Sequence, residues 1–143
     1  MAHRDIRPDN IMFANKFSYQ IKIIDFGISQ KVAPGQFMTE CFGTPYYLAP
    51  EVIKGVYTLK CDVWSVGVIF YIMLINQTPF EHKDMTKLLE MIKNSSNLSF
   101  ENKMWKTRSV GCIDLVKKLM DTNDKVRISA EAAIQHVWLM SNS

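Results

Sequence analysis

The stretch His3-Arg4-Asp5-Ile6-Arg7-Pro8-Asp9-Asn10 stands near the start of the sequence, and Asp25-Phe26-Gly27 follows it. Two short apolar runs, residues 11–13 and 21–24, lie between these stretches and are separated by mostly polar residues, which predicts two small strands joined by a loop. Either stretch alone would be an ordinary charged turn. Their order and their hairpin-length spacing instead predict one compact site, built from a tight loop and the end of the next strand.

Further stretches downstream extend this pattern. They are Gly43-Thr44-Pro45-Tyr46-Tyr47-Leu48-Ala49-Pro50-Glu51, Asp62-Val63-Trp64-Ser65-Val66-Gly67-Val68, Thr78-Pro79-Phe80, Asp124-Lys125-Val126-Arg127-Ile128-Ser129 and His136-Val137-Trp138. Together with the two stretches at the start, they resemble the catalytic domain of Ser/Thr protein kinases over essentially the whole chain. Residues 23–29 and 60–65 are most similar to those of the calcium-dependent and calmodulin-dependent protein kinase group.

The resemblance implies transfer of the terminal phosphate of ATP to a Ser or Thr hydroxyl of a protein substrate. Such transfer needs a carboxylate that orients the hydroxyl and accepts its proton, oxygen ligands for Mg²⁺, and positive charge near the transferred group. By resemblance Asp5 is the base, and Asn10 and Asp25 hold the magnesium ion. Arg7 supplies the positive charge, at a position where the family usually has Lys.

Other positions are expected to support this site. Thr44 should bond to Asp5, which favours a Ser/Thr kinase over a tyrosine kinase. Asp62 should accept hydrogen bonds from the backbone N–H groups of His3-Arg4 and so hold the catalytic loop in place. Met12 would form part of the apolar floor under the adenine of ATP, although a simple strand-core role fits its position equally well.

Residues 25–51 are expected to form the activation segment of such a kinase. Glu51 and Arg127 should form a buried ion pair that links the end of this segment to the rest of the fold. Glu40 stands where many related kinases carry an activating phosphothreonine, so its carboxylate could pair with Arg4 and order the segment without phosphorylation. The alternative for Glu40 is a solvated loop glutamate.

The implied fold is mainly α: the C-terminal lobe of a protein kinase, a partial kinase domain over residues 1–143, with a small β-hairpin beside the catalytic loop and no N-terminal lobe. The apolar residues of 62–74 predict a buried central helix, with Asp62 either as its N-terminal cap or as a buried anchor. Helical spacing predicts further helices over 84–93, 110–120 and 130–134. Val110 is expected on the apolar face of the second of these, and polar residues 94–103 predict a loop.

The sequence contains no Gly-rich loop, strand lysine or helix glutamate ahead of His3-Arg4-Asp5, where the family has them. Without these parts nothing would close over ATP, so negligible catalysis is expected from this chain alone. The alternative to an enzyme is a non-catalytic module of the same fold that docks substrate or partner proteins.

Composition and charge argue against several other classes of protein. A net charge of +3 with scattered lysines gives no basic stripe for nucleic acid, and three widely separated cysteines suit neither a disulfide framework nor a zinc site. The most apolar stretch is too short to span a membrane, and charges from Arg4 onward argue against a signal peptide, so a cytoplasmic location is expected. No EF-hand loop pattern occurs, and any calcium-sensing regulatory segment would lie outside this chain.

Overall fold

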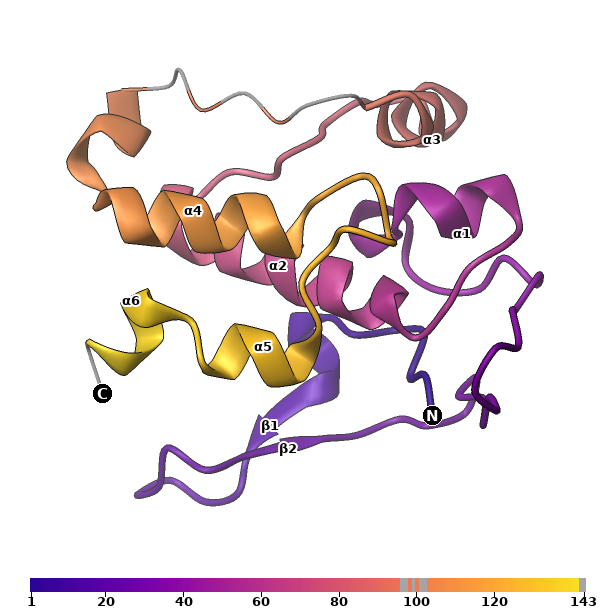
Figure 1. Cartoon of the computed structure of the whole chain (residues 1–143), viewed down its shortest axis with the longest axis horizontal. Coiled ribbons are helices and arrows are strands. Elements are labelled where there is room, and N and C mark those ends of the chain that lie inside the picture. The colour runs from indigo at the N-terminus through magenta and orange to yellow at the C-terminus, as the bar shows by residue number, and fades with distance from the viewer. Residues whose placement is uncertain (96–97, 99, 101–102, 142–143) are drawn as a thin grey trace.

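The computed structural model describes residues 1–95, 98, 100 and 103–141. The described chain is rich in helix and contains one two-stranded antiparallel sheet. Figure 1 shows the sheet on one side of the helices and helix α3 on the opposite side. The elements are η1 (Pro8–Asn10), β1 (Ile11–Phe13), β2 (Ile21–Ile23), η2 (Pro45–Tyr47), α1 (Pro50–Lys54), α2 (Lys60–Ile75), α3 (Met85–Lys93), η3 (Lys103–Thr107), α4 (Val110–Leu119), α5 (Ala130–Ile134) and α6 (Val137–Met140).

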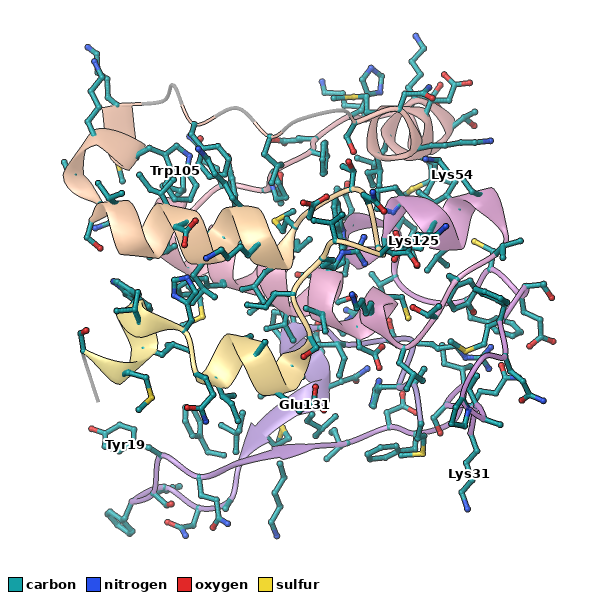
Figure 2. The ribbon with its side chains drawn as sticks, in the orientation of Figure 1. Tyr19, Lys31, Lys54, Trp105, Lys125 and Glu131 are labelled. Carbon is teal, nitrogen blue, oxygen red and sulfur yellow. The ribbon has the colours of Figure 1, made fainter. Side chains whose placement is uncertain are left out.

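Strands β1 and β2 form the predicted hairpin, with Ile11 opposite Ile23 and Phe13 opposite Ile21. Most of its apolar side chains are exposed, among them Met12, Phe13 and Ile21. The tip extends away from the helices, and Figure 2 shows Tyr19 at this outer end. The side chains of Phe17 and Tyr19 are each 98% exposed.

Helix α2 is the central helix of the fold. Trp64, Val68 and Tyr71 lie on its buried face and belong to the main apolar core. The helix begins at Lys60 rather than at residue 62, so Asp62 is not its N-terminal cap. Asp62 lies instead in the first helical turn, where its carboxylate accepts hydrogen bonds from another part of the chain, as in the anchor alternative.

Helix α4 crosses close to α2 at Gly67. A side-chain carbon at this position would lie 2.6 Å from Cγ of Met120 and 3.0 Å from Cβ of Leu119, so the approach requires glycine. The predicted helix over 110–120 is confirmed with one difference: Val110 is not on the buried face but is 85% exposed. Val110 occupies the first helical position, directly after the capping residue Ser109, which is itself exposed.

The segment between the hairpin and α2 contains more regular structure than its composition predicts. Residues Pro45–Tyr47 form a 3-10 turn, and helix α1 begins at Pro50. Two isolated bridges, Ala2 to Gln30 and Met38 to Tyr57, pair the segment with neighbouring backbone. Its long loop is therefore held at several points along its length.

The C-terminal part matches the prediction for α5, whose first turn is capped by Ser129. Helix α6 was not predicted and is capped by the side chain of His136. The predicted loop over 94–103 lies partly outside the described residues. Over the described part of the chain, no helix has the length and apolar character needed to cross a membrane.

Candidate active site

Asp5 stands at the centre of a hydrogen-bond network formed by two loops. Its Oδ1 accepts bonds from the backbone nitrogen and the hydroxyl of Thr44, at 3.0 and 2.7 Å. Its Oδ2 accepts a bond from the side-chain nitrogen of Asn10 at 3.1 Å. The carboxylate is thus held in one orientation while the residue stays half-buried rather than enclosed.

The loop that carries Asp5 is held from below by α2. The two carboxylate oxygens of Asp62 accept from the backbone nitrogens of His3 and Arg4, at 2.7 and 2.9 Å. Arg4 has a left-handed φ of 69°, an unfavourable backbone conformation for a residue other than glycine. The paired bonds to Asp62 help to keep the backbone in this turn. The predicted contact between Asp62 and His3-Arg4 is therefore present.

The His3 ring lies between the catalytic loop and the end of the hairpin. Its Nε2 is 2.9 Å from the carbonyl oxygen of Ile24, and its ring meets that of Phe26 edge-on at 4.9 Å between centroids. Both ring contacts lie beside Asp25. The imidazole thus holds the two stretches of the site against each other.

Asn10 and Asp25 lie close together at the open end of the hairpin. The Ile24 nitrogen donates to the backbone oxygen of Asn10 at 3.0 Å, which brings Asp25 alongside. Asn10 donates from its side-chain nitrogen to the backbone oxygen and Oδ2 of Asp5, which leaves its side-chain oxygen able to bind a metal ion. Asp25 is exposed, and its Oδ1 accepts from the Gly27 nitrogen at 3.2 Å.

These atoms suit a magnesium ion. Magnesium prefers hard oxygen ligands and is commonly held by one or two protein carboxylates together with phosphate oxygens and water. Asp25 supplies a carboxylate and Asn10 an amide oxygen. No group of three or more His, Cys, Asp or Glu side chains that could hold a metal ion occurs among the described residues.

Arg7 lies on the other side of Asp5. Its Nη1 donates to the Thr44 hydroxyl at 2.8 Å, while Nε and Nη2 both donate to Oδ2 of Asp9, at 2.9 and 2.7 Å. The hydrogen bonds that Arg7 donates to Asp9 raise the pKa of the Arg7 guanidinium, and the same bonds lower the pKa of the Asp9 carboxyl. A fixed positive charge therefore lies beside Thr44, within reach of the Asp5 region.

Arg4 connects the catalytic loop to residues 28–42. Its Nε donates to the carbonyl oxygen of Ile28 at 2.5 Å, and its Nη1 lies 3.3 Å from Oε2 of Glu40. The guanidinium also lies over the ring of Phe42, 4.9 Å from the centroid. Tyr57 donates its hydroxyl to the Glu40 carbonyl at 2.6 Å. Glu40 is thus in contact with Arg4, as predicted, rather than only in solvent.

The ion pair between Glu51 and Arg127 is present and buried. Nη1 and Nη2 of Arg127 donate to Oε1 and Oε2 of Glu51, at 2.5 and 2.8 Å, and the guanidinium lies 5.1 Å from the ring centroid of Trp64. Arg127 is 1% exposed and also donates to the backbone oxygens of Asp121 and Lys60. Its donors are therefore well satisfied, as a buried charge requires.

Met12 does not lie with the other predicted site residues in this network. It is at the centre of β1 with 53% of its surface exposed, so the strand-core alternative does not hold within this chain. The sequence pattern gave Asp9 only weak significance, for substrates with arginine, and gave Gly43 no role of its own in the site. The opposite charges of Arg7 and Asp9, two positions apart, were a signal for their contact. A Cβ on Gly43 would lie 2.5 Å from the carbonyl oxygen of Arg4, so the two loops meet closely there.

Comparison with known proteins agrees with this geometry. Residues 1–139 match the family model described as the protein kinase domain. The chain is 42% identical over 140 residues to calcium-dependent protein kinase 8 of Oryza sativa subsp. japonica, covering 97% of this chain and 26% of that protein. It is 39% identical over 141 residues to calcium-dependent protein kinase 4 of Arabidopsis thaliana, covering 98% of this chain and 28% of that protein. The chain therefore spans about a quarter of the length of these relatives.

Proposed function

The chain belongs to the protein kinase domain family, and from this premise we propose that it forms the C-terminal lobe of a Ser/Thr protein kinase. The observation that carries the proposal is the orientation of Asp5, whose carboxylate is held by Thr44 and Asn10. A carboxylate fixed in this way and still half-exposed suits a group that must meet an incoming hydroxyl.

In the proposed reaction, Asp5 orients the substrate Ser or Thr hydroxyl and accepts its proton. The hydroxyl oxygen forms a bond to the terminal phosphorus of ATP as the bond from that phosphorus to the bridging oxygen breaks, and ADP leaves. Thr44 holds Asp5 in position, and Arg7 places positive charge next to it. Asn10 and Asp25 are the residues that would hold magnesium, which when bound offsets the negative charge of the phosphates.

We propose that residues 25–51 act as the activation segment and that Glu40 orders it without phosphorylation. The contacts of Arg4 with Glu40 and Phe42 support this role. If Glu40→Ala left amide exchange across residues 28–42 unchanged, the ordering role of Glu40 would be refuted. Glu40→Gln, which keeps the size of the side chain but removes its charge, separates electrostatic from packing effects.

The chain alone is proposed to have negligible activity. Met12 and the rest of the hairpin next to Asp25 are exposed, so the described residues do not enclose a nucleotide there. Exclusion of water strengthens the electrostatic interactions on which phosphoryl transfer depends. Protein substrates, and calcium-sensing segments like those that the names of the relatives suggest, would be partners of a longer protein.

A docking module without catalysis is the second candidate. It is favoured by an apolar groove of about 330 Å³ between α2, α4, α5 and the end of α6, whose lining includes Val66, Phe70, Met73 and Ile134. A surface of this kind is normally covered by further protein. The intact set of Asp5, Asn10 and Asp25 favours the kinase proposal over this one.

Phosphate transfer from labelled MgATP to a serine or threonine peptide tests the two candidates. It should be measured for this chain and for a version extended at its N-terminus by the preceding lobe of a relative. We expect turnover only in the extended version, and Asp5→Asn should reduce it by about 10²-fold or more because the base is lost. An active extended protein that tolerates Asp5→Asn would contradict the proposed mechanism. Complete inactivity of a folded, nucleotide-binding extended protein would favour the docking module.

A further inference from the structure

The Arg7 guanidinium binds two partners through different edges. Nε and Nη2 donate to Oδ2 of Asp9, and Nη1 donates to the hydroxyl oxygen of Thr44. A guanidinium is planar and rigid, with its five N–H groups in fixed directions. Once Asp9 holds one edge, the plane of the group is largely set. The position of Nη1 at Thr44 therefore depends on Asp9.

The Thr44 hydroxyl transmits this contact to Asp5. Its oxygen lies 2.8 Å from Nη1 of Arg7 and 2.7 Å from Oδ1 of Asp5. A guanidinium can only donate, so the single hydroxyl proton of Thr44 must be directed to the carboxylate. Arg7 thus selects the hydroxyl orientation in which Thr44 donates to Asp5.

We propose that Asp9 is a positioning residue of this site, which holds Arg7 against Thr44 and through the Thr44 hydroxyl orients the Asp5 carboxylate. The series of bonds Asp9–Arg7–Thr44–Asp5 is called the Asp9 relay below. The effect of the relay on catalysis rests on the proposed kinase function, but the contacts themselves do not depend on that function. A lysine at position 7 would not form the same relay, because an ammonium is a point charge without a planar fork.

The relay leaves part of Arg7 available. Of the five N–H groups of a guanidinium, three are used by the bonds described, so two remain for the oxygens of a phosphate. The charge of Asp9 is balanced by Arg7 in the same pair. Although Asp9 is exposed, it therefore attracts a cationic group of a substrate less than an unpaired carboxylate would.

The Arg7–Asp9 contact can be measured directly, without nucleotide. The sequence contains four arginines. Three of them, Arg4, Arg108 and Arg127, donate Nε–H to backbone carbonyl oxygens. In the bonds that the described residues show, Arg7 donates its Nε–H to a carboxylate instead. In nitrogen-15 NMR spectra of the chain at neutral pH, this bond should slow the exchange of the Arg7 Nε–H with water.

Substitutions separate the relay from a local structural effect. Asp9→Asn should speed the exchange of the Arg7 Nε–H with water and shift the backbone N–H signal of Thr44, which donates to Asp5. Asp9→Glu, which keeps a carboxylate, should return both signals toward those of the unsubstituted chain. Glu81→Gln, which removes an exposed carboxylate outside this network, should leave both signals unchanged.

A double substitution gives the decisive comparison. If Asp9 acts through Arg7, then Asp9→Asn should produce no further shift at Thr44 in a chain that already carries Arg7→Lys. An equal shift in both backgrounds would overturn the relay, as would an exchange rate of the Arg7 Nε–H that Asp9→Asn leaves unchanged. Because none of these readouts involves phosphate transfer, failure of the relay leaves the proposed kinase function standing, and failure of the kinase assay leaves the relay standing.

Discussion

The loop of residues 3–10, called the catalytic loop for its proposed role, and the β1–β2 hairpin are neighbours in the sequence, yet the rest of the molecule holds them in different ways. The loop donates bonds to Asp62 in α2 and accepts bonds from Thr44 in the segment before α1. The hairpin has the ladder of its own two short strands, and its tip is exposed. A two-stranded hairpin alone is only marginally stable in water. The difference indicates that the surroundings of Asp5 are fixed by distant parts of the chain, while the hairpin tip is held by little besides its own ladder.

The largest effect should come from breaking the buried ion pair between Glu51 and Arg127. Arg127→Met removes the partner of Glu51 and leaves a buried carboxylate unpaired, so we expect the free energy of unfolding to fall by about 3–5 kcal/mol. Denaturant unfolding monitored by fluorescence is suitable, because Trp64 lies beside Arg127. Glu51→Gln/Arg127→Met, which removes both charges, should recover part of the loss. A loss below about 1 kcal/mol for the single substitution would show that the pair does not hold the segment.

A smaller loss is expected where the two loops approach each other. Gly43 has a left-handed φ of 118°, and a Cβ there would lie 2.5 Å from the carbonyl oxygen of Arg4. Gly43→Ala should cost about 1–3 kcal/mol and weaken the amide-exchange protection of the His3 and Arg4 N–H groups. Gly35→Ala is the matched control, since Gly35 also has a positive φ but no atom within 4 Å of its Cβ. Equal costs at both glycines would mean that backbone strain, and not the contact with Arg4, sets the effect.

Breaking the exposed ion pair of Asp114 should lower the free energy of unfolding by less than the two substitutions above and by more than a change at the hairpin tip. Asp114 accepts from Lys118 at 2.7 Å and lies 2.9 Å from Nε2 of His136. The bond from Lys118, followed by that from His136, lowers the pKa of the Asp114 carboxyl. Its contribution is therefore present above the ordinary carboxyl pKa of about 3.9 and is lost as pH falls through the lowered value.

Asp114→Asn tests this contribution. At neutral pH the substitution should lower the free energy of unfolding by less than about 1 kcal/mol, because the pair is exposed. The difference between the two proteins should shrink as pH is lowered through the carboxyl range, measured by denaturant unfolding at each pH. A difference that stays constant across this range would assign the effect to packing instead of charge.

The smallest effect on stability is expected at the hairpin tip. Phe17→Ser and Tyr19→Ser remove side chains that are 98% exposed, so the free energy of unfolding should change by less than about 0.5 kcal/mol. Light scattering should show reduced self-association of the same variants, because exposed aromatic surface promotes it. A loss of more than about 1 kcal/mol would show that the tip is packed in solution, and the contrast with the catalytic loop would disappear.

The sequence pattern correctly predicted several contacts between residues that are far apart in the chain. The contacts of Thr44 with Asp5, of Asp62 with His3-Arg4 and of Glu51 with Arg127 are all present. Each depends on the family pattern more than on local propensity, because its partners are far apart in the chain. Periodicity likewise located α3 and the body of α4, where a clear apolar face meets the core.

Other features could not be predicted from the sequence. Asp62 was a possible cap by residue type, but the start of α2 depends on how residues 57–60 leave the bridge between Met38 and Tyr57. Helix α6 is too short to show a period. The pair of Arg7 and Asp9 depends on two rotamers and on the nearby Thr44, none of which a one-dimensional pattern specifies.

The backbone nitrogens of His3 and Arg4, and not their side chains, donate to Asp62. Every residue type except proline offers the same N–H group, so substitutions at positions 3 and 4 would leave the donors of these two bonds in place. Position 62 has no such freedom, since its carboxylate accepts both bonds. A single side chain of α2 therefore anchors the turn that precedes Asp5, through bonds that do not depend on which side chains the turn carries.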